Sequence, residues 1–328
     1  MQQMEKTEFS LWWKNPGDGP EEIWTLNPDD QGETIFHLAP FVSSLRYPKC
    51  EVRGKMERSF FPKPGTIALK ACAETVETTQ EEHEEAVTQA LDFIEKGAFE
   101  KVVISRSNLW REANSPEFVF AQKCMAHKHA LVYLLVHPIA GVWLGATPEL
   151  LLRQEGIHYE TVSLAGTRKA DREEWTKKEM REQSMVTDFI AQTLKSRNAQ
   201  SIQIDVPKDR SYGEMAHLES RIRFESTAPH QHWLHALHPT PAVGGQPRNV
   251  AIDFIAKHER QSRGYYAGYL GWSSPDGARF YVNLRCMQWF SSGARIFAGG
   301  GIIAGSDATS EWEETEIKIQ SIRQVSAS

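Results

Sequence analysis

The sequence predicts an α+β fold, and three observations support this class. Strand patterns rich in β-branched and aromatic residues recur along the 328 residues. Amphipathic helical patterns are interspersed among these strands, which look antiparallel. No repeat of 20–50 residues and no Gly/Ser/Pro-rich linker divides the chain. We therefore expect one large domain of mixed strands and helices.

The elements follow in order, after an N-terminal part of about 60 residues that is less regular. A helix over 78–97 is expected, because it has Thr at its start, acids in its first turn and Gly97 to end it. Three more helices are expected from Ser115, over 171–196 and over 249–259, and a final one begins near Asp307. Strands are expected over 65–72, 101–110, 130–136, 141–166 with turns at Gly156 and Gly166, 217–226, 265–272, 279–289 and 294–303.

Composition excludes several classes of protein. The chain has 37 Lys+Arg and 43 Asp+Glu, a formal charge of −6, and no basic tract, so electrostatic binding of nucleic acid is not expected. The N-terminus lacks the apolar core of a signal peptide, and the longest apolar run, 130–136, is too short to span a membrane. The four cysteines are scattered without a C-x-x-C pair, which is typical of a reducing compartment. We expect a soluble, cytoplasmic protein, and nothing demands a partner chain, so we expect a monomer.

Two of the expected helices carry acids at the same spacing. On the last helix Glu311, Glu314 and Lys318 form one stripe, because residues three and four apart share a face. On the helix over 171–196, Glu179 and Glu182 begin a similar stripe that continues in apolar residues. Solvated acids at a protruding helix start explain one such helix. Two of them suggest oxygen ligands for Mg²⁺, although E-x-x-E alone is a weak motif.

Eight short segments make the interpretation specific. In chain order they are KVVISR (101–106), GATPELLLR (145–153), LAGTR (164–168), LHPTPAVGGQP (237–247), YYAGYLGW (265–272), VNLRC (282–286), FAGGGI (297–302) and SEWEET (310–315). Together they resemble the chorismate-utilising enzyme family, and among its members the isochorismate synthases most. The resemblance implies the fold of anthranilate synthase component I, with two packed antiparallel sheets and helices on the outside. It also implies one domain over 1–328, with a divergent part over about 1–95 and the catalytic core over 96–328.

The same resemblance implies an isomerase, an isochorismate synthase serving menaquinone or siderophore biosynthesis. Such an enzyme adds water at C2 of chorismate and expels the C4 hydroxyl, with Mg²⁺ as cofactor. Lys101 matches the general base, and its amine must be desolvated or set near another cation to act at neutral pH. Glu149 matches the general acid, and an apolar pocket would raise the pKa of its carboxyl. Without the resemblance, the two would be a surface lysine and a turn glutamate.

The resemblance also assigns the metal and substrate residues. Glu182 and Glu314 match the primary Mg²⁺ ligands, and Glu179 and Glu311 would support them from one turn earlier. The family usually has His after the first ligand, whereas this chain has Gln183, which weakens the assignment of that supporting position. The implied substrate-binding residues are Arg285 at the enolpyruvyl carboxylate, Lys318 beside the metal, Gly299 for close backbone approach, and Thr167, His217 and Ala242 along the ring.

Other members of the family remain alternatives. Ammonia-using relatives lack lysine at the position of Lys101, tend to carry Thr at that of Ala242, and partner a glutamine amidotransferase. The two residues present here favour water as the nucleophile, so no amidotransferase subunit is expected. A salicylate synthase, which goes on to eliminate pyruvate from isochorismate, has the same Lys and Glu. A non-catalytic homologue that only binds a carboxylate ligand is the alternative outside enzymes.

Overall fold

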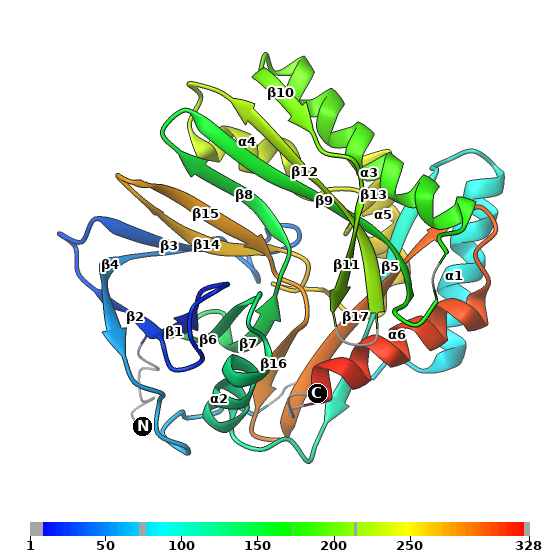
Figure 1. Cartoon of the computed structure of the whole chain (residues 1–328). Coiled ribbons are helices and arrows are strands. Elements are labelled where there is room, and N and C mark those ends of the chain that lie inside the picture. Colours follow the sequence, from blue (N-terminus) through cyan, green and yellow to red (C-terminus); the bar gives the residue numbers. More distant parts are fainter. Residues whose placement is uncertain (1–8, 72–76, 173, 213–214, 325–328) are drawn as a thin grey trace.

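The computed structural model describes residues 9–71, 77–172, 174–212 and 215–324. Within these residues seventeen strands form one hydrogen-bonded sheet, which folds over on itself (Figure 1). The strands before the first helix are β1 (Ser10–Lys14), β2 (Ile23–Pro28), β3 (Thr34–Ala39) and β4 (Cys50–Ser59). Those that follow are β5 (Lys101–Trp110), β6 (Leu131–His137), β7 (Gly141–Thr147), β8 (Leu150–Glu155), β9 (His158–Lys169), β10 (Gln200–Ile204), β11 (Lys208–Tyr212), β12 (Met215–Glu225), β13 (Gly245–Gln246), β14 (Tyr269–Ser274), β15 (Gly277–Val282), β16 (Cys286–Phe290) and β17 (Gly293–Ile303).

Strand order explains how distant segments meet. At one end β10 and β11 both pair with β12, and the order continues through β9, β8, β15, β14 and β3. It then runs through β4, β2, β1, β6, β7, β16 and β17 to β5 and β13. These pairs are antiparallel, as the sequence predicts. Because the sheet curls, β9 and β12 come to face β5 and β17 across a cavity.

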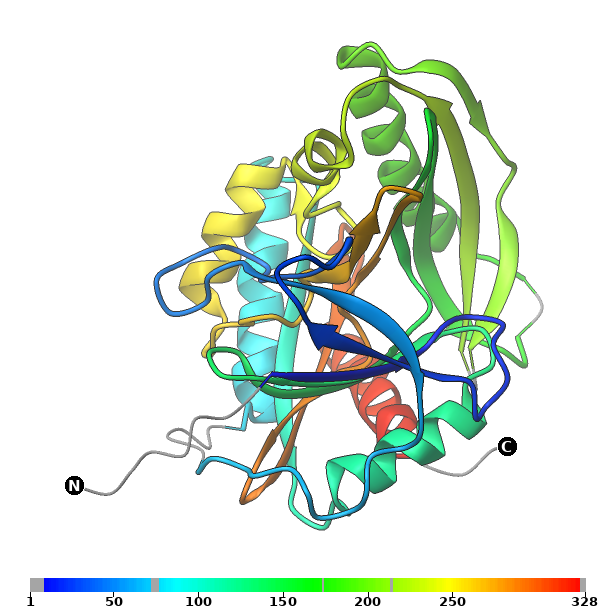
Figure 2. The same cartoon turned by 90° about the vertical axis from the view of Figure 1, so that its left-hand side faces the viewer.

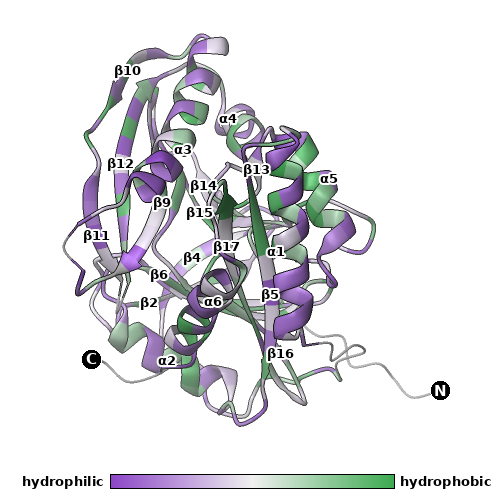
Figure 3. Cartoon of the chain, turned by 90° about the vertical axis from the view of Figure 1, so that its right-hand side faces the viewer, coloured by the Kyte–Doolittle hydropathy of each residue, from purple (hydrophilic) through white to green (hydrophobic). Residues whose placement is uncertain are grey.

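Helices cover the outer faces of the sheet. They are α1 (Gln80–Glu95), α2 (Pro116–Ala126), α3 (Lys177–Ser196), α4 (His230–Leu237), α5 (Arg248–His258) and α6 (Ala308–Arg323). Helix α3 lies on β9 and β12, α2 lies on β6 and β7, and α1 and α6 lie on β5 and β17. Figure 2 shows α1 and α5 side by side, and Figure 3 shows hydrophilic residues along the outside of α1. No helix of the described ranges is both long and apolar enough to span a bilayer.

Two apolar clusters hold these layers together. The larger one includes Trp143, Leu152 and Phe280 and fills the space where the folded sheet closes on itself. The smaller one joins α2 and α6 to β6, β7, β16 and β17, with Phe120 and Ile319 among its buried members. Burial of this apolar area provides the main favourable free energy of folding.

Some predicted elements differ from the structure. Residues 65–71 form no strand, because the Glu117 carboxylate accepts the backbone N–H groups of Thr66 and Ile67, each at 2.9 Å. The remaining residue of that predicted strand, Cys72, lies outside the described residues. The N-terminal part is more regular than predicted, since 10–59 contain β1 to β4. The sequence patterns also missed β10, β11 and α4.

The predicted strand over 279–289 is two strands, β15 and β16. Asn283 interrupts the ladder between them. Its fully buried amide accepts from the Tyr133 hydroxyl at 2.6 Å and donates to the Tyr265 carbonyl at 2.9 Å. Gly166 is a bulge within β9 rather than a turn, with φ 70°. The turn predicted at Gly156 is confirmed between β8 and β9.

Strand β8 links the β9–β12 end of the sheet to β15, so its core residues should control stability. Leu152 of β8 is fully buried. We expect Leu152→Ala to lower the free energy of unfolding by about 2–5 kcal/mol, because it leaves a cavity in a packed core. Ile157, in the turn after β8, is 49% exposed, and Ile157→Ala should change stability by less than about 0.5 kcal/mol. Urea unfolding of both variants measures this, and equal effects would contradict the assigned core.

Candidate active site

A cavity of about 930 Å³ opens between the facing parts of the sheet. Its walls come from β9 and β12 on one side and β5 and β17 on the other, with α3 and α6 contributing acids. Nine of the twelve site residues predicted from the sequence line it: Glu149, Thr167, Glu182, His217, Ala242, Arg285, Gly299, Glu314 and Lys318. The other three, Lys101, Glu179 and Glu311, are not part of its lining.

Lys101 lies directly behind the cavity wall. It begins β5, its side chain is fully buried, and its Nζ donates to Glu182 Oε1 at 2.8 Å. Gly301 of β17 makes room for this pair, since a Cβ there would lie 2.3 Å from that same oxygen. Burial alone would raise the pKa of Glu182, but the charge and hydrogen bond of Lys101 hold it below its usual value. The Lys101 amine does not line the cavity itself but is hydrogen-bonded to the Glu182 carboxylate, which does.

Glu149 is in a different electrostatic environment. It lies between β7 and β8, is 7% exposed, and its backbone carbonyl accepts from the Val282 N–H at 3.0 Å. Burial raises the pKa of its carboxyl to about 7, although the charges of Arg285, Lys101 and Lys318 oppose that shift. Glu149 can therefore hold a proton near neutral pH while lining the cavity.

His217 and Arg285 form another part of the cavity wall. The His217 Nδ1 lies 3.2 Å from the Gly166 carbonyl, which can only accept, so Nδ1 carries the proton. Its Nε2 then accepts from Arg285 Nη2 at 3.4 Å. Burial, followed by the charges of Arg285 and Lys318, lowers the pKa of His217 to about 3. The imidazole is neutral at physiological pH, which suits a binding role for His217.

Each of the four predicted metal-binding acids has a cation beside it. The pairs are Glu182 with Lys101 at 2.8 Å, Glu314 with Lys318 at 2.7 Å, Glu311 with Lys178 at 3.0 Å, and Glu179 with Arg172. Across the described ranges, no group of three or more His, Cys, Asp or Glu residues is placed to hold a metal ion. One carboxylate from each helix, Glu182 of α3 and Glu314 of α6, thus lines the cavity, and neighbouring amines and a guanidinium balance the charges of all four acids.

Glu311 and Glu179 differ in how near they come to this cavity. Glu311 is 4% exposed, and a Cβ at Gly300 would lie 2.8 Å from its Oε2, so it lies over β17. Burial, followed by the charge of Glu314, raises the pKa of Glu311. Glu179 instead completes a capping box at the start of α3, where its Oε2 accepts from the Thr176 N–H at 2.8 Å. Its role in metal binding stays a prediction.

Lys318 explains the mixed charge of the α6 stripe. Its Nζ donates to Glu314 Oε1 at 2.7 Å and to the Gly299 carbonyl at 2.8 Å. The amine thus ties α6 to the glycine-rich part of β17 and also lines the cavity. Glu311, Glu314 and Lys318 of this helical face therefore lie where α6 packs on β17 beside the cavity.

Sequence reasoning missed several residues of the site. Arg263, 4% exposed, lines the cavity and donates to the carbonyls of Val243 at 2.6 Å and Val103 at 2.7 Å. Tyr266 also lines it, stacked on Phe297 with ring centroids 5.2 Å apart. Tyr266 lies within the segment over 265–272, and Arg263 lies two residues before it. This segment was the feature of the sequence that could have identified them.

Gln183, where the family usually has His, packs behind the site. It is 2% exposed, and its Nε2 donates to the Ser163 carbonyl at 3.2 Å and to Ser220 Oγ at 3.4 Å. These contacts fasten α3 to β9 and β12 directly beside Glu182. Gln183 therefore orients the helix that carries this acid.

Known proteins share both the sequence and the fold. A salicylate biosynthesis isochorismate synthase of Pseudomonas aeruginosa is 31% identical over 256 residues, which are 74% of this chain and 54% of that protein. The chain spans about half to two thirds of the length of the curated relatives it matches. The menaquinone-specific isochorismate synthase MenF of Escherichia coli superposes with a TM-score of 0.80 at 22% identity, covering 98% of this chain and 89% of that one. Anthranilate synthase component I of Streptococcus pneumoniae superposes with a TM-score of 0.71 at 16% identity, covering 99% and 94%.

The two solved structures confirm the fold that the sequence predicts. The sequence profile named chorismate binding enzyme matches residues 55–326, which is most of the chain. This match includes all eight segments on which the resemblance depends. The protein therefore belongs to the chorismate binding enzyme family.

Proposed function

We propose that this protein is an isochorismate synthase, which converts chorismate into isochorismate by adding water at C2 and releasing the C4 hydroxyl. The observation that carries the proposal is the contrast between two groups at one cavity. Glu149 is a buried carboxyl with a pKa of about 7, and Lys101 is a buried amine joined to the cavity wall through Glu182. Relatives of about 30% identity that are named isochorismate synthases support the same reaction.

The reaction needs one group to donate a proton and one to accept it. Hydroxide is a poor leaving group, so the protonated Glu149 carboxyl donates to the C4 oxygen and water departs. Lys101 is the proposed base, which accepts a proton from the water that attacks C2. The ring double bonds shift between these carbons, so product and substrate are isomers. General acid and base groups each contribute about 10²–10⁴-fold to such rates.

The substrate also carries two carboxylates that need partners. Arg285 presents a planar guanidinium to the cavity, and the neutral His217 beside it fixes its position. Lys318 supplies a second cation on the α6 side. Gly299 brings backbone close to the ligand without a side chain between them. This arrangement supports a rigid dicarboxylate as ligand.

We propose Mg²⁺ as the cofactor, and the donor set fits this ion. Glu182 and Glu314 line the cavity, and Mg²⁺ commonly uses one or two carboxylates together with water and substrate oxygens. The adjacent glycines Gly300 and Gly301 leave space for Glu311 and Glu182. Glu182 and Glu314 would hold the ion, and Glu311 would support them from α6. When bound, the ion would neutralise these acids and anchor the ring carboxylate of the substrate.

The direct test is to incubate the protein with chorismate and Mg²⁺ and to identify the product by chromatography and mass spectrometry. Isochorismate is expected, and Lys101→Ala should yield none while keeping a wild-type circular dichroism spectrum. Salicylate together with pyruvate would replace the proposal with a salicylate synthase. If the folded wild-type protein converts no chorismate, the remaining interpretation is a non-catalytic homologue that only binds a carboxylate ligand.

Glu149→Gln should lower kcat by about 10²–10⁴-fold, because the amide cannot protonate the leaving hydroxyl. Wild-type kcat/KM should fall as pH rises through about 7, since the acid works only in its protonated form. Steady-state rates across pH 5 to 9 measure this limb. Glu155→Gln, on the exposed end of β8, is the control and should keep the wild-type profile. An unchanged alkaline limb in Glu149→Gln would remove Glu149 as the acid.

Removal of one metal-binding acid should abolish the response to Mg²⁺. We expect Glu314→Ala to lose most turnover and to show no heat of Mg²⁺ binding in calorimetry, because only Glu182 remains of the two proposed metal ligands that line the cavity. Glu313→Ala, one position earlier on α6 and outside the cavity lining, is the matched control. Full activity of the wild type in excess chelator would contradict the metal assignment.

A further inference from the structure

A second hollow adjoins the cavity and has no role in the proposed chemistry. This charged cleft, of about 1340 Å³, lies between the end of α2 and the strands β8, β9, β11, β12 and β15. Pro148, next to the proposed acid, lines both the cleft and the cavity. The two hollows are therefore neighbours at the point where Glu149 is held.

Strand β12 runs along both hollows. Residues alternate between the faces of a strand, so His217, Glu219 and Arg221 lie on one face of β12. His217 lines the cavity, whereas Glu219 and Arg221 line the cleft. On β11, Arg210 is the register partner of His217 and also lines the cleft. The face that forms the cavity wall thus continues into the cleft.

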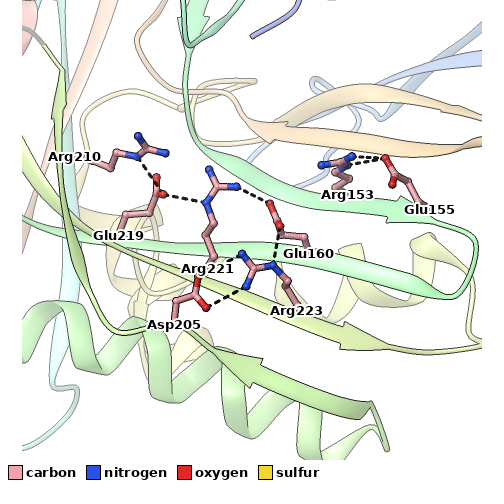
Figure 4. Close-up of polar contacts among 8 residues, drawn as sticks. All are labelled: Arg153, Glu155, Glu160, Asp205, Arg210, Glu219, Arg221 and Arg223. Carbon is pink, nitrogen blue, oxygen red and sulfur yellow. Dashed lines mark hydrogen bonds and ion pairs between the residues drawn. The ribbon is translucent and has the colours of Figure 1, made fainter. Parts of the chain in front are cut away.

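The charges on this face are layered (Figure 4). Glu219 accepts from Arg210 Nε at 3.2 Å and from Arg221 Nε at 3.4 Å, and Glu160 accepts from Arg221 Nη1 at 3.1 Å. The side chains of the two acids are only 12% and 15% exposed, whereas those of the two arginines are 48% and 40% exposed. The less exposed acids Glu219 and Glu160 therefore hold the side chains of Arg210 and Arg221 in place by hydrogen bonds, and these arginines are exposed to the solvent in the cleft.

The cleft is cationic although the chain is acidic. Five cations line it against two carboxylates, whereas the whole chain has a formal charge of −6. The cations are Lys128, Arg153, Arg210, Arg221 and Arg279. A cleft lined mainly by one sign of charge concentrates the field and attracts ligands of opposite charge.

The charge of Arg285 links the cavity to the cleft. His127, at the end of α2, lines the cleft, and burial lowers its pKa to about 4. The charges of Lys123 and Arg285 contribute to that shift. Because Arg285 lines the cavity, its charge acts on a residue that lines the cleft.

We propose that the charged cleft captures the dicarboxylate substrate by electrostatic attraction and delivers it past Pro148 to the cavity. This inference rests on the proposed function, since it takes the substrate to be a dianion. The cleft arginines do not line the cavity in which the reaction takes place, so they affect substrate capture and not the chemical step.

The test compares steady-state kinetics of the wild type with Arg210→Gln/Arg279→Gln. Glu219 keeps Arg221 as a partner in this variant, so the charge layer retains its anchor. At low ionic strength we expect kcat/KM for chorismate to fall about tenfold with kcat unchanged, the range of electrostatic steering. In about 1 M salt the difference should disappear, because the Debye length shrinks to about 3 Å.

Two control variants separate charge from other effects. Lys55→Gln/Arg58→Gln removes two cations from β4, which lines neither hollow, and should leave kcat/KM unchanged. Arg210→Lys/Arg279→Lys should keep wild-type values, since steering needs charge and not the shape of the guanidinium. A kcat/KM loss that persists in 1 M salt, or no loss at low salt, would overturn the inference. A wild type that does not convert chorismate would refute the proposed function instead.

Discussion

The buried pair between Lys101 and Glu182 is the interaction on which the site depends. It joins the start of β5 to α3, and α3 lies on the opposite part of the folded sheet. A lysine that is fully buried needs a partner, because an unpaired charge in an apolar interior is strongly unfavourable. Gly301 leaves room for this contact, since a Cβ at that position would lie 2.3 Å from Glu182 Oε1. The pair thus sets the distance between the two walls of the cavity and places the amine behind one of them.

Against this pair, Glu149 is the contrasting carboxylate. Within the described ranges it has no ion-pair partner, and burial raises its pKa, whereas Lys101 keeps the pKa of Glu182 low. Two carboxylates at one cavity are thereby pushed toward opposite protonation states, which is how enzymes separate acid and anion roles. The difference between the two pKa values comes from the positions of the neighbouring cations and not from the residue type, since both residues are glutamates. A sequence motif can name the acids, but only the fold decides which of them stays protonated.

Sequence patterns predict the parts of this fold that depend on local periodicity. The helices over 80–95 and 177–196 and strand β5 follow from caps and apolar spacing. The break at Asn283 and the irregular path of 65–71 depend on partners distant in the chain, Tyr133 and Glu117, so no local pattern predicts them. The site shows the same division. Its acids are readable as motifs, whereas the capping role of Glu179 and the space at Gly301 depend on three-dimensional contacts.

The position of the apolar core also explains where a charged ligand can approach. Apolar residues fill the sheet where it closes on itself, and β12 contributes Ile222 and Phe224 to that core from one face. Its other face carries Glu219, Arg221 and Arg223, which sequence alone would assign to a solvated surface. In the folded chain this face looks onto hollows between the layers, so its charges are concentrated instead of dispersed in solvent. The apolar residues of the closed end offer an anion no partner, whereas the charged face of β12 continues to His217 and to the cavity that Arg285 and Glu182 line.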